Sequence, residues 1–369
     1  MRKYFDTYYN WWKNIDKSIF FIITILFVLG LFFSFVSTSI IASDKLNTNS
    51  YYFFLKHFIF VLLGIFIIFF LSLLNQRILI NISTIFFLVA LISLFMVPLI
   101  GEEVKGSKRW LDIGPLPRFQ PIETLKPFFI IAVSFILSLD NKNLNYKYLL
   151  SSLILIPIII LLLLQPDLGQ TLLIIVVWLA IVFVSGINLF LFSFSLIAIC
   201  ALTSYLVFFV PKFNYIKIRL TAFLDASGDN NYQADKASDA ISSGGFFGKG
   251  IGEGTLNSRI PEAHTDYIMS VIAEEFGVLI VIGIVMLYLI FSYRVIRKIS
   301  FTENNNFKLI LVGSVTVILV QTFIHVGVNL RMFPTTGMTM PFLSYGGSSI
   351  IGTSILTGII LNLTKRKLN

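Results

Sequence analysis

An acidic residue at the start of a long apolar segment is the first candidate for chemistry in this sequence. Asp266 ends the run Pro-Glu-Ala-His-Thr-Asp, in which Glu262 adds a second carboxylate and His264 adds an imidazole. A carboxylate in this position can take a proton from a sugar hydroxyl, or bind a divalent cation beside a pyrophosphate. The alternative is structural, because Thr265 and Asp266 are residue types that accept hydrogen bonds from the first free amides of a helix.

Two more carboxylates, Glu274 and Glu275, follow within the same apolar segment. Carboxylates inside a membrane are costly, so they are functional candidates by default. In a single helix, a rotation of about 100° per residue places Glu274 roughly 80° from Asp266 and Glu275 roughly 180° from it. We therefore expect Glu274, and not Glu275, to share one face of a polar cavity with Asp266.

An oppositely charged pair opens another apolar segment. Glu123 and Lys126 lie three residues apart in the run Gln-Pro-Ile-Glu-Thr-Leu-Lys-Pro, a spacing that brings two side chains together on one face of a helix. The alternative is a glutamate that complements the helix dipole and a lysine that extends to the membrane surface. Because Lys126 lies a full turn inside the apolar segment, we expect a buried pair that lines a polar cavity.

A basic segment precedes this pair. It contains Lys108 and Arg109, with Lys105 and Arg118 on either side. Four cations in one loop can bind an anionic headgroup, or they can simply be solvated. We expect Arg109 to support the cavity and Lys108 to contact a substrate.

A glycine-rich run is a further candidate for substrate contacts. Gly244 and Gly245 open a series of six glycines that ends at Gly254. Glycine lets backbone amides approach a phosphate closely, whereas the alternative is a turn-rich loop with no ligand. The spacing of these glycines fits neither a P-loop nor a dinucleotide-binding motif.

Asp167, Ser348 and Ser349 complete the candidate substrate contacts. Asp167 lies in the run Gln-Pro-Asp-Leu-Gly and is also a good helix N-cap. Ser348 and Ser349 follow two glycines at the start of the last apolar stretch, where small residues allow either close helix packing or the approach of a ligand to the backbone.

The composition places all these residues in a membrane protein. Of the 369 residues, 56% are apolar and 13% are charged, whereas a typical soluble domain has about 25% charged residues. The single cysteine, Cys200, excludes an internal disulfide and a cysteine-based zinc site. Ten apolar stretches are long enough to be considered as membrane spans, at 18–42, 51–74, 78–100, 120–139, 148–164, 168–186, 188–210, 267–293, 307–329 and 346–363. We expect an all-α bundle of about ten transmembrane helices, forming a single polytopic membrane domain over residues 1–369.

The distribution of Lys and Arg predicts the orientation. With the N-terminus inside, the inner segments contain fourteen of these residues and the short outer loops contain six, which favours both termini in the cytoplasm. The long segment 211–266, between the seventh and eighth spans, then lies outside. The net charge of +9 is explained by the membrane surface and does not indicate nucleic acid. ATP is effectively absent outside the cell, so chemistry on that side needs an activated substrate.

These motifs, taken in order, resemble the SEDS family of shape, elongation, division and sporulation proteins. The resemblance is collinear over nearly the whole chain. It rests on Gly106–Trp110, Gln120–Pro127, Gln165–Gly169, Phe223–Asp225, Tyr232–Gln233, Ser243–Gly245, Pro261–Asp266, Glu274–Gly277 and Ser344–Ser349. Two departures from the family pattern are Ile122 and Ala226, where the family usually has Ser and Pro.

The resemblance implies a peptidoglycan glycosyltransferase that polymerises lipid II at the outer face of the cytoplasmic membrane, embedded among its lipids. It implies a class B penicillin-binding protein and other divisome proteins as partners. Asp266 then matches the family's essential carboxylate, as a general base or as a ligand to Mg²⁺ or Mn²⁺. Glu123 and Lys126 match its charged pair, and Arg109 matches its outer-loop arginine. The segment 329–342 is more similar to the division members than to the elongation members, which implies a role at the division septum.

Other functions remain open at this point. An elongation polymerase of the same family is one. A lipid II flippase is another, since ten spans with buried charges also suit a transporter, although the two halves show no evident inverted repeat. A non-catalytic scaffold that recruits the penicillin-binding protein is the third, but a scaffold has no need of Asp266 or of the Glu123 and Lys126 pair.

Overall fold

The computed structural model describes residues 9–46, 51–104, 107–112, 114, 117–140, 143–224, 232–256, 260 and 262–365. Lys105, Gly106, Asp225, Ala226 and Pro261, which the sequence motifs include, lie outside these described residues. The helices are α2 (Lys17–Leu46), α3 (Tyr52–Leu73), α4 (Gln76–Ile100), α5 (Pro121–Leu137), α6 (Leu144–Leu164), α7 (Leu168–Val184), α8 (Leu189–Phe209), η1 (Pro211–Phe213), α9 (Asn214–Leu224), α10 (Tyr232–Gly244), α11 (Ile268–Phe276), α12 (Val278–Ile299), α13 (Asn305–Asn329) and α14 (Gly347–Leu363). Two short strands, β1 (Glu102–Val104) and β2 (Ser107–Trp110), form an antiparallel hairpin.

The predicted apolar stretches coincide with helices of the bundle. Seven described helices are long and apolar enough to cross a membrane, and α7 and α14 are shorter apolar helices. Helix α5 is also short and carries the charged residues Glu123 and Lys126. The all-α membrane bundle is therefore confirmed, whereas the number of ten spans stays a prediction.

One predicted stretch is broken into two helices. The segment 267–293 was expected to be one helix, but α11 ends at Phe276 and α12 begins at Val278. Gly277 between them has a φ of 84°, a conformation that glycine adopts without a steric penalty. A Cβ at this position would also lie 2.2 Å from the carbonyl oxygen of Phe246. The continuous helix was thus a wrong prediction, because the glycine changes the chain direction.

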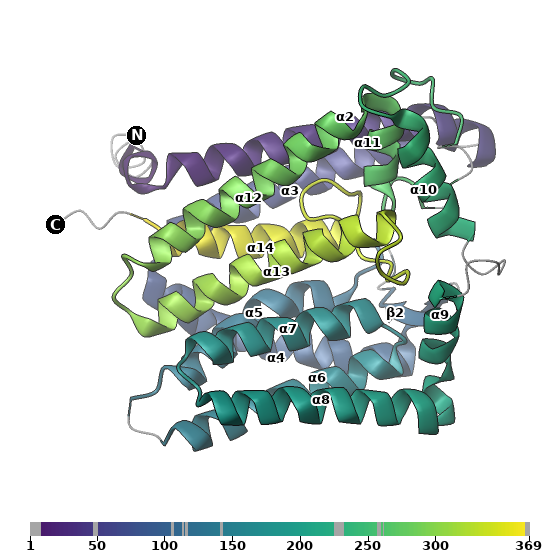
Figure 1. Ribbon diagram of the computed structural model, residues 1–369. Helices are drawn as coiled ribbons and strands as arrows, with labels where there is room; N and C mark the ends of the chain where they lie inside the picture. The colour runs from purple at the N-terminus through teal and green to yellow at the C-terminus, as the bar shows by residue number, and fades with distance from the viewer. Residues whose placement is uncertain are drawn as a thin grey trace.

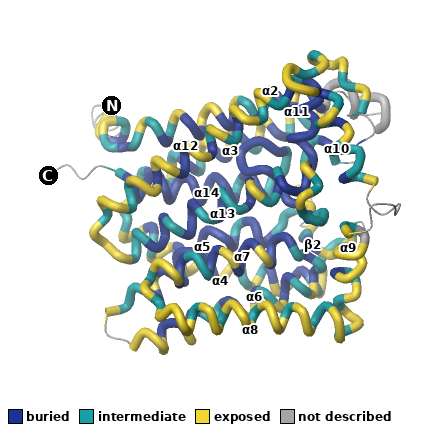
Figure 2. Tube along the Cα trace, in the orientation of Figure 1, coloured by how far each residue is buried: buried dark blue, intermediate teal, exposed yellow. Residues whose placement is uncertain are grey.

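Close contacts between small residues hold the centre of the bundle. Figure 1 shows α13, α14 and α5 in the middle, with α2, α3 and α12 on one side and α4, α6, α7 and α8 on the other. A Cβ at Gly352 of α14 would lie 2.3 Å from the carbonyl oxygen of Glu123 on α5. This close approach is the use of small residues that is typical of membrane helices. Helix α8, in contrast to these closely packed helices, has no buried residue (Figure 2).

The two ends of the bundle differ. The beginning of α2 and the end of α14 lie at one end, and the hairpin, α9, α10 and α11 lie at the other (Figure 1). The long segment between α8 and α11 contains η1, α9 and α10, whereas its glycine-rich run after Gly244 consists of turns and bends, as the turn-rich alternative predicted. Helix α10 packs against α11 through small residues on one face, namely Ala234, Ala237, Ala240 and Gly244.

Candidate active site

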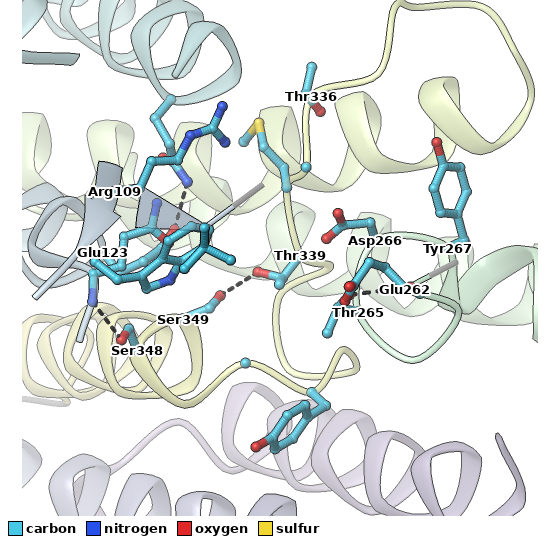
Figure 3. Close-up of a pocket in the computed structure, with 18 of the residues that line it drawn as sticks. Arg109, Glu123, Glu262, Thr265, Asp266, Tyr267, Thr336, Thr339, Ser348 and Ser349 are labelled. Atoms are coloured by element: carbon cyan, nitrogen blue, oxygen red, sulfur yellow. Dashed lines mark hydrogen bonds between the residues drawn. The ribbon is translucent and has the colours of Figure 1, made fainter. Parts of the chain in front are cut away.

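A polar cavity of about 530 Å³ lies at the end of the bundle that carries the hairpin and α9. Most of its lining comes from the hairpin, the start of α5, the turn before α11, the loop between α13 and α14, and the start of α14 (Figure 3). Single residues of α3, α7, α9, α10 and α13 complete it. Its walls include seven of the residues expected to form the site, namely Arg109, Glu123, Glu262, His264, Asp266, Ser348 and Ser349.

Asp266 lies in a turn before α11, and its carboxylate points into the cavity (Figure 3). The N-cap of α11 is Tyr267, which makes no side-chain capping bond, so neither Thr265 nor Asp266 serves as the helix cap. The amide of Asp266 donates to the carbonyl of Glu262 over 3.1 Å. Glu262 has a φ of 56°, and backbone strain of this kind is concentrated at functional sites.

Long-range hydrogen bonds fix this turn. The side chain of Asn329, at the end of α13, donates to the carbonyl of Asp266 over 3.1 Å. The hydroxyl of Ser344 donates to the carbonyl of Thr265 over 2.7 Å, and the amide of Tyr345 donates to the carbonyl of His264 over 3.1 Å. The ring of His264 packs against Phe53 and Tyr345. The position of Asp266 is therefore determined by three segments that are distant in the sequence.

Arg109 and Asp266 flank the same glycine. A Cβ at Gly337 would lie 3.6 Å from Oδ2 of Asp266 and 3.7 Å from Nη1 of Arg109. Both atoms thus lie within 4 Å of the position that a Cβ of residue 337 would occupy. Because residue 337 is glycine, no side chain fills that position. A cation and a carboxylate face a common space here, with room for the reacting part of a ligand.

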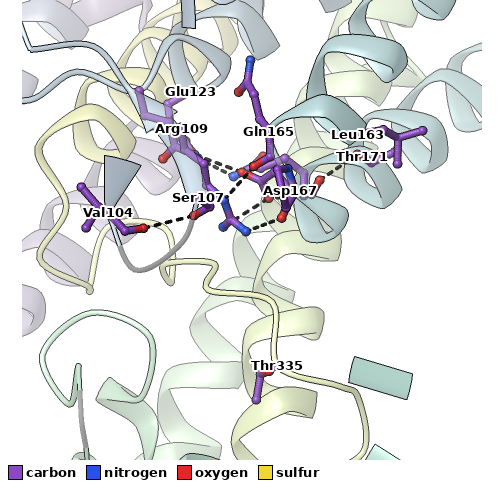
Figure 4. A network of polar contacts seen from close by, with 12 residues as sticks. Val104, Ser107, Arg109, Glu123, Leu163, Gln165, Asp167, Thr171 and Thr335 are labelled. Atoms are coloured by element: carbon purple, nitrogen blue, oxygen red, sulfur yellow. Dashed lines mark hydrogen bonds and ion pairs between the residues drawn. The ribbon is translucent and has the colours of Figure 1, made fainter. Parts of the chain in front are cut away.

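Arg109 is itself held by the turn between α6 and α7 (Figure 4). Its Nε donates to the carbonyl of Gln165 over 3.3 Å, and its Nη2 donates to the carbonyl of Pro166. Its Nη1 lies 3.7 Å from Oδ1 of Asp167. Asp167 also accepts from the amide of Gln170 as the N-cap of α7. Asp167 therefore orients Arg109 and does not line the cavity, and its contact with substrate stays a prediction.

The hairpin places the neighbouring basic residues Lys108 and Arg109 on opposite faces of β2. Successive side chains of a strand point to opposite faces, and on β2 Arg109 is buried while Lys108 is exposed. Lys108 does not line the cavity, and its contact with substrate stays a prediction. Arg118 lines the cavity but forms an ion pair with Glu102, with Nε and Oε2 2.7 Å apart.

A buried polar network supports the inner side of the cavity. Nζ of Lys126 lies 2.8 Å from Oε2 of Glu123 and donates to Gln321 over 3.0 Å. Oε1 of Glu123 accepts from Gln170 over 2.6 Å. Both charged side chains are less than 5% exposed. The buried pair is confirmed and the surface-directed lysine is excluded, although Glu123 alone of the two lines the cavity.

The last helix begins beside this network. The hydroxyl of Ser348 accepts from the amide of Gln120 over 2.9 Å, and the hydroxyl of Ser349 accepts from Thr339 over 2.7 Å. Gln321 donates to the carbonyl of Thr339 over 2.9 Å. These bonds connect the start of α14 to α5, α13 and the loop that carries Gly337.

Three other expected site residues lie outside the cavity. Oε1 of the fully buried Glu274 is 3.4 Å from Nζ of Lys249 and accepts from the amide of Leu256 over 3.0 Å. A Cβ at Gly244 would lie 2.0 Å from the carbonyl oxygen of Ala273, and Gly245 follows with a φ of 58°. Glu274, Gly244 and Gly245 therefore join the glycine-rich segment to α11. The expected place of Glu274 in the cavity is wrong, whereas substrate contact by Gly244 and Gly245 stays a prediction.

Several functional candidates were missed in the sequence. Gln321 and Asn329 are polar residues inside a predicted span, and that signal alone was enough to single them out. Gln170 and Arg219 line the cavity as well, but nothing in their local sequence distinguishes them from neighbouring polar residues.

The donor set does not form a protein-bound metal centre. Among the described residues, no group of three or more His, Cys, Asp or Glu side chains could hold a metal ion. Glu262 beside Asp266 accepts a hydrogen bond from Thr265 over 3.2 Å. Binding of Mg²⁺ or Mn²⁺ by Asp266 therefore stays a prediction.

Comparison with known proteins agrees with this architecture. The model of the FtsW, RodA and SpoVE cell cycle proteins matches residues 16–369. The chain belongs to this family. It is 30% identical over 360 residues to a protein of Caulobacter vibrioides named "Probable peptidoglycan glycosyltransferase FtsW", with 97% of this chain and 91% of the relative covered. It is 32% identical over 365 residues to the protein of the same name from Idiomarina loihiensis, with 94% and 86% covered.

Solved structures share the fold. A chain of a peptidoglycan synthase complex, described as coordinating polymerization and crosslinking, superposes with a TM-score of 0.77 at 27% identity, covering 95% of this chain and 97% of that one. The rod shape determining protein RodA of Thermus thermophilus gives a TM-score of 0.70 at 26% identity, covering 95% and 96%. The family resemblance noted in the sequence is confirmed, and the named relatives agree with its division branch.

Proposed function

We propose that this chain is a peptidoglycan glycosyltransferase of the FtsW type, which polymerises lipid II during septal wall synthesis. The observation that carries the proposal is the pair of charges at Gly337, where a carboxylate and a guanidinium face one space in a polar cavity. The names of relatives at 30% and 32% identity support the same reaction.

Asp266 acts as the general base. It takes the proton from the 4-hydroxyl of the acceptor sugar, and the hydroxyl oxygen then bonds to the anomeric carbon of the donor. The bond between that carbon and the pyrophosphate oxygen breaks, and undecaprenyl pyrophosphate leaves with the bonding electrons. Arg109 stabilises the negative charge that develops on the leaving group. Because the leaving group carries the activation, the reaction needs no nucleotide.

The cavity faces the outside of the cell in this proposal. The beginning of α2 and the end of α14 share one end of the bundle (Figure 1), and the excess of Lys and Arg assigns that end to the cytoplasm. The hairpin, α9 and the cavity then lie at the outer face of the cytoplasmic membrane, where lipid II is presented for polymerisation.

A class B penicillin-binding protein is the proposed partner, with other divisome proteins assembling around the pair. The similarity to a chain of a peptidoglycan synthase complex supports this partnership. Such a partner cross-links the strands that this chain polymerises.

The test is polymerisation of fluorescent lipid II by the purified chain with its partner, followed by separation of glycan chains on a gel. The wild type should give a ladder, and Asp266→Asn and Asp266→Ala should give none while remaining folded and bound to the partner. Asp239→Asn is the matched control, because Asp239 is an exposed carboxylate of α10 away from the cavity. Undiminished ladders from both Asp266 variants would remove Asp266 from the reaction. Transport of lipid II between leaflets by the chain alone, with no polymer formed, would replace this proposal by a flippase.

A further inference from the structure

A second arginine reaches the cavity from α9. Arg219 lines the cavity, and its Nη1 donates to the carbonyl of Thr335 over 3.5 Å. Thr335 belongs to the same loop as Gly337, which Arg109 approaches from the hairpin. Two guanidinium groups from distant parts of the sequence thus converge on one loop at the cavity wall.

Both guanidinium groups are influenced by the charge of Asp167. Asp167 lies 3.7 Å from Arg109, and its charge also acts on Arg219. Burial and then the positive charge of Arg109 lower the pKa of the Arg219 guanidinium, whereas Asp167 and Tyr215 act in the opposite direction. An anionic ligand placed between the two guanidinium groups would relieve their mutual repulsion.

Both groups retain donors for such a ligand. A guanidinium has five N–H donors in a planar fork that matches a phosphate. Arg109 directs its Nε and Nη2 to backbone carbonyls, while its Nη1 lies on the side of Gly337 and contacts Asp167 only at 3.7 Å. Arg219 uses one N–H for Thr335 at the long distance of 3.5 Å.

The other nearby cations are placed differently. Arg118 is engaged in the ion pair with Glu102, Lys108 is exposed on the opposite face of β2, and Lys126 is bound to Glu123 and Gln321. Among the described residues, Arg109 and Arg219 are therefore the pair best placed to bind an anion together.

We propose that Arg109 and Arg219 form a two-guanidinium clamp for a pyrophosphate group, with one guanidinium on each phosphoryl unit. Arg219 is then a further substrate-binding residue, and Arg109 holds the phosphoryl unit closer to Asp266. This assignment rests on the proposed function, since it identifies the part of the cavity that holds the leaving group. Gly337 lies between Arg109 and Asp266, and its missing side chain leaves space there for the leaving group and the acceptor hydroxyl to meet.

The clamp is tested by equilibrium binding, independently of catalysis. Inorganic pyrophosphate and inorganic phosphate are titrated calorimetrically into the purified full-length chain in detergent. The variants are Arg219→Gln, which removes the charge, and Arg219→Lys, which keeps it. The matched control is Lys217→Gln, which removes an exposed cation from the same helix. Thermal unfolding of each variant identifies any loss of the fold.

Loss of a charge-assisted contact predicts roughly 10- to 100-fold weaker pyrophosphate binding by Arg219→Gln. Arg219→Lys should recover part of the affinity, and Lys217→Gln should bind like the wild type. Phosphate should bind at least about tenfold more weakly than pyrophosphate, because it engages one guanidinium at a time. Wild-type affinity in a folded Arg219→Gln, an equal loss in Lys217→Gln, or equal affinities for the two anions would overturn the clamp.

The same titration separates the clamp from the proposed function. Absence of pyrophosphate binding by the wild type would overturn the clamp even if the chain polymerises lipid II. Pyrophosphate binding that depends on Arg219, in a chain that forms no glycan ladder with its partner, would support the clamp and overturn the polymerase.

Discussion

The side-chain amide of Asn329 donates to the backbone carbonyl of Asp266 over 3.1 Å, while its oxygen accepts from both the amide and the hydroxyl of Ser270. Asn329 ends α13, and Ser270 lies in the first turn of α11. One buried amide therefore connects the turn that carries the carboxylate to two helices. It determines where Asp266 lies without entering the cavity lining.

Replacing Asn329 by Ala should move Asp266 without removing it. Loss of this buried network predicts a free energy of unfolding lower by about 1–3 kcal/mol. We expect kcat for lipid II polymerisation to fall by at least about tenfold, since small displacements of a catalytic group are costly. Ser270→Ala is the control, because the backbone amide of Ser270 still binds Asn329. An Asn329→Ala enzyme with wild-type kcat would show that this bond does not position the base.

Removing the charge of Lys126 should destabilise the inner side of the cavity. Lys126→Met leaves the carboxylate of Glu123 buried without its cation, which predicts a loss of about 3–5 kcal/mol. The double variant Glu123→Gln with Lys126→Met removes both charges and should regain a large part of that loss. Thermal unfolding in detergent measures both. A double variant that is less stable than Lys126→Met would show that the unpaired carboxylate of Glu123 is not the cause of the loss.

Replacement by alanine should lower the stability of the fold by different amounts at the adjacent residues Gly244 and Gly245, at the end of α10. A Cβ at Gly244 would overlap the backbone of Ala273, whereas a Cβ at Gly245 meets nothing within 4 Å. Gly245→Ala should cost about 1–2 kcal/mol, from the left-handed backbone alone. Gly244→Ala should cost more, because α10 has to move away from α11. Unfolding midpoints compare the two, and equal losses would argue against the close packing of these helices.

The opposite end of the bundle provides a pH-dependent contact. Asp16 accepts from the amide of Ile19 over 3.2 Å, and its Oδ2 lies 3.0 Å from Nζ of Lys298. Burial raises the pKa of Asp16, but the hydrogen bond and charge of Lys298 and the backbone hydrogen bonds outweigh it, so the pKa lies below its ordinary value of 3.8.

A carboxyl group with a lowered pKa in the folded state stabilises the fold above its unfolded pKa, and this contribution is lost as pH falls through the folded pKa. Asp16→Asn should therefore unfold at a lower temperature than the wild type at pH 7. The difference should shrink as the pH is taken below 3.8. A difference that stays constant over this range would show that the charge of Asp16 contributes nothing.

The sequence revealed the parts of the site that depend on composition. Long apolar stretches predict membrane helices because the bilayer requires them, and Glu123 and Lys126 stood out because charges there are rare. The place of Glu274 was predicted wrongly for a geometric reason. Counting 100° per residue from Asp266 assumed a common helix, but α11 begins at Ile268, after the turn.

Other features depended on tertiary contacts. Helix α10 buries Ala and Gly, so its sequence lacks the large apolar side chains that usually mark the packed face of a helix. The opposite directions of Lys108 and Arg109 depend on a strand of four residues, too short to be recognised by alternation. Arg219 gained its significance from Arg109, more than a hundred positions earlier in the sequence.

The ion pair of Glu123 and Lys126 also bears on the electrical integrity of the membrane. A water-accessible cavity shortens the insulating layer, and each elementary charge that leaks through it dissipates about 2.3 kcal/mol per 100 mV. On α5 the pair is followed by Phe129, Ile130 and Val133, all fully buried, and Lys126 is paired with Glu123 where the polar lining ends. The pair carries no net charge, and the apolar side chains behind it continue the insulating layer. In the proposed orientation, the bundle can hold a polar cavity at its outer end and still preserve the membrane potential.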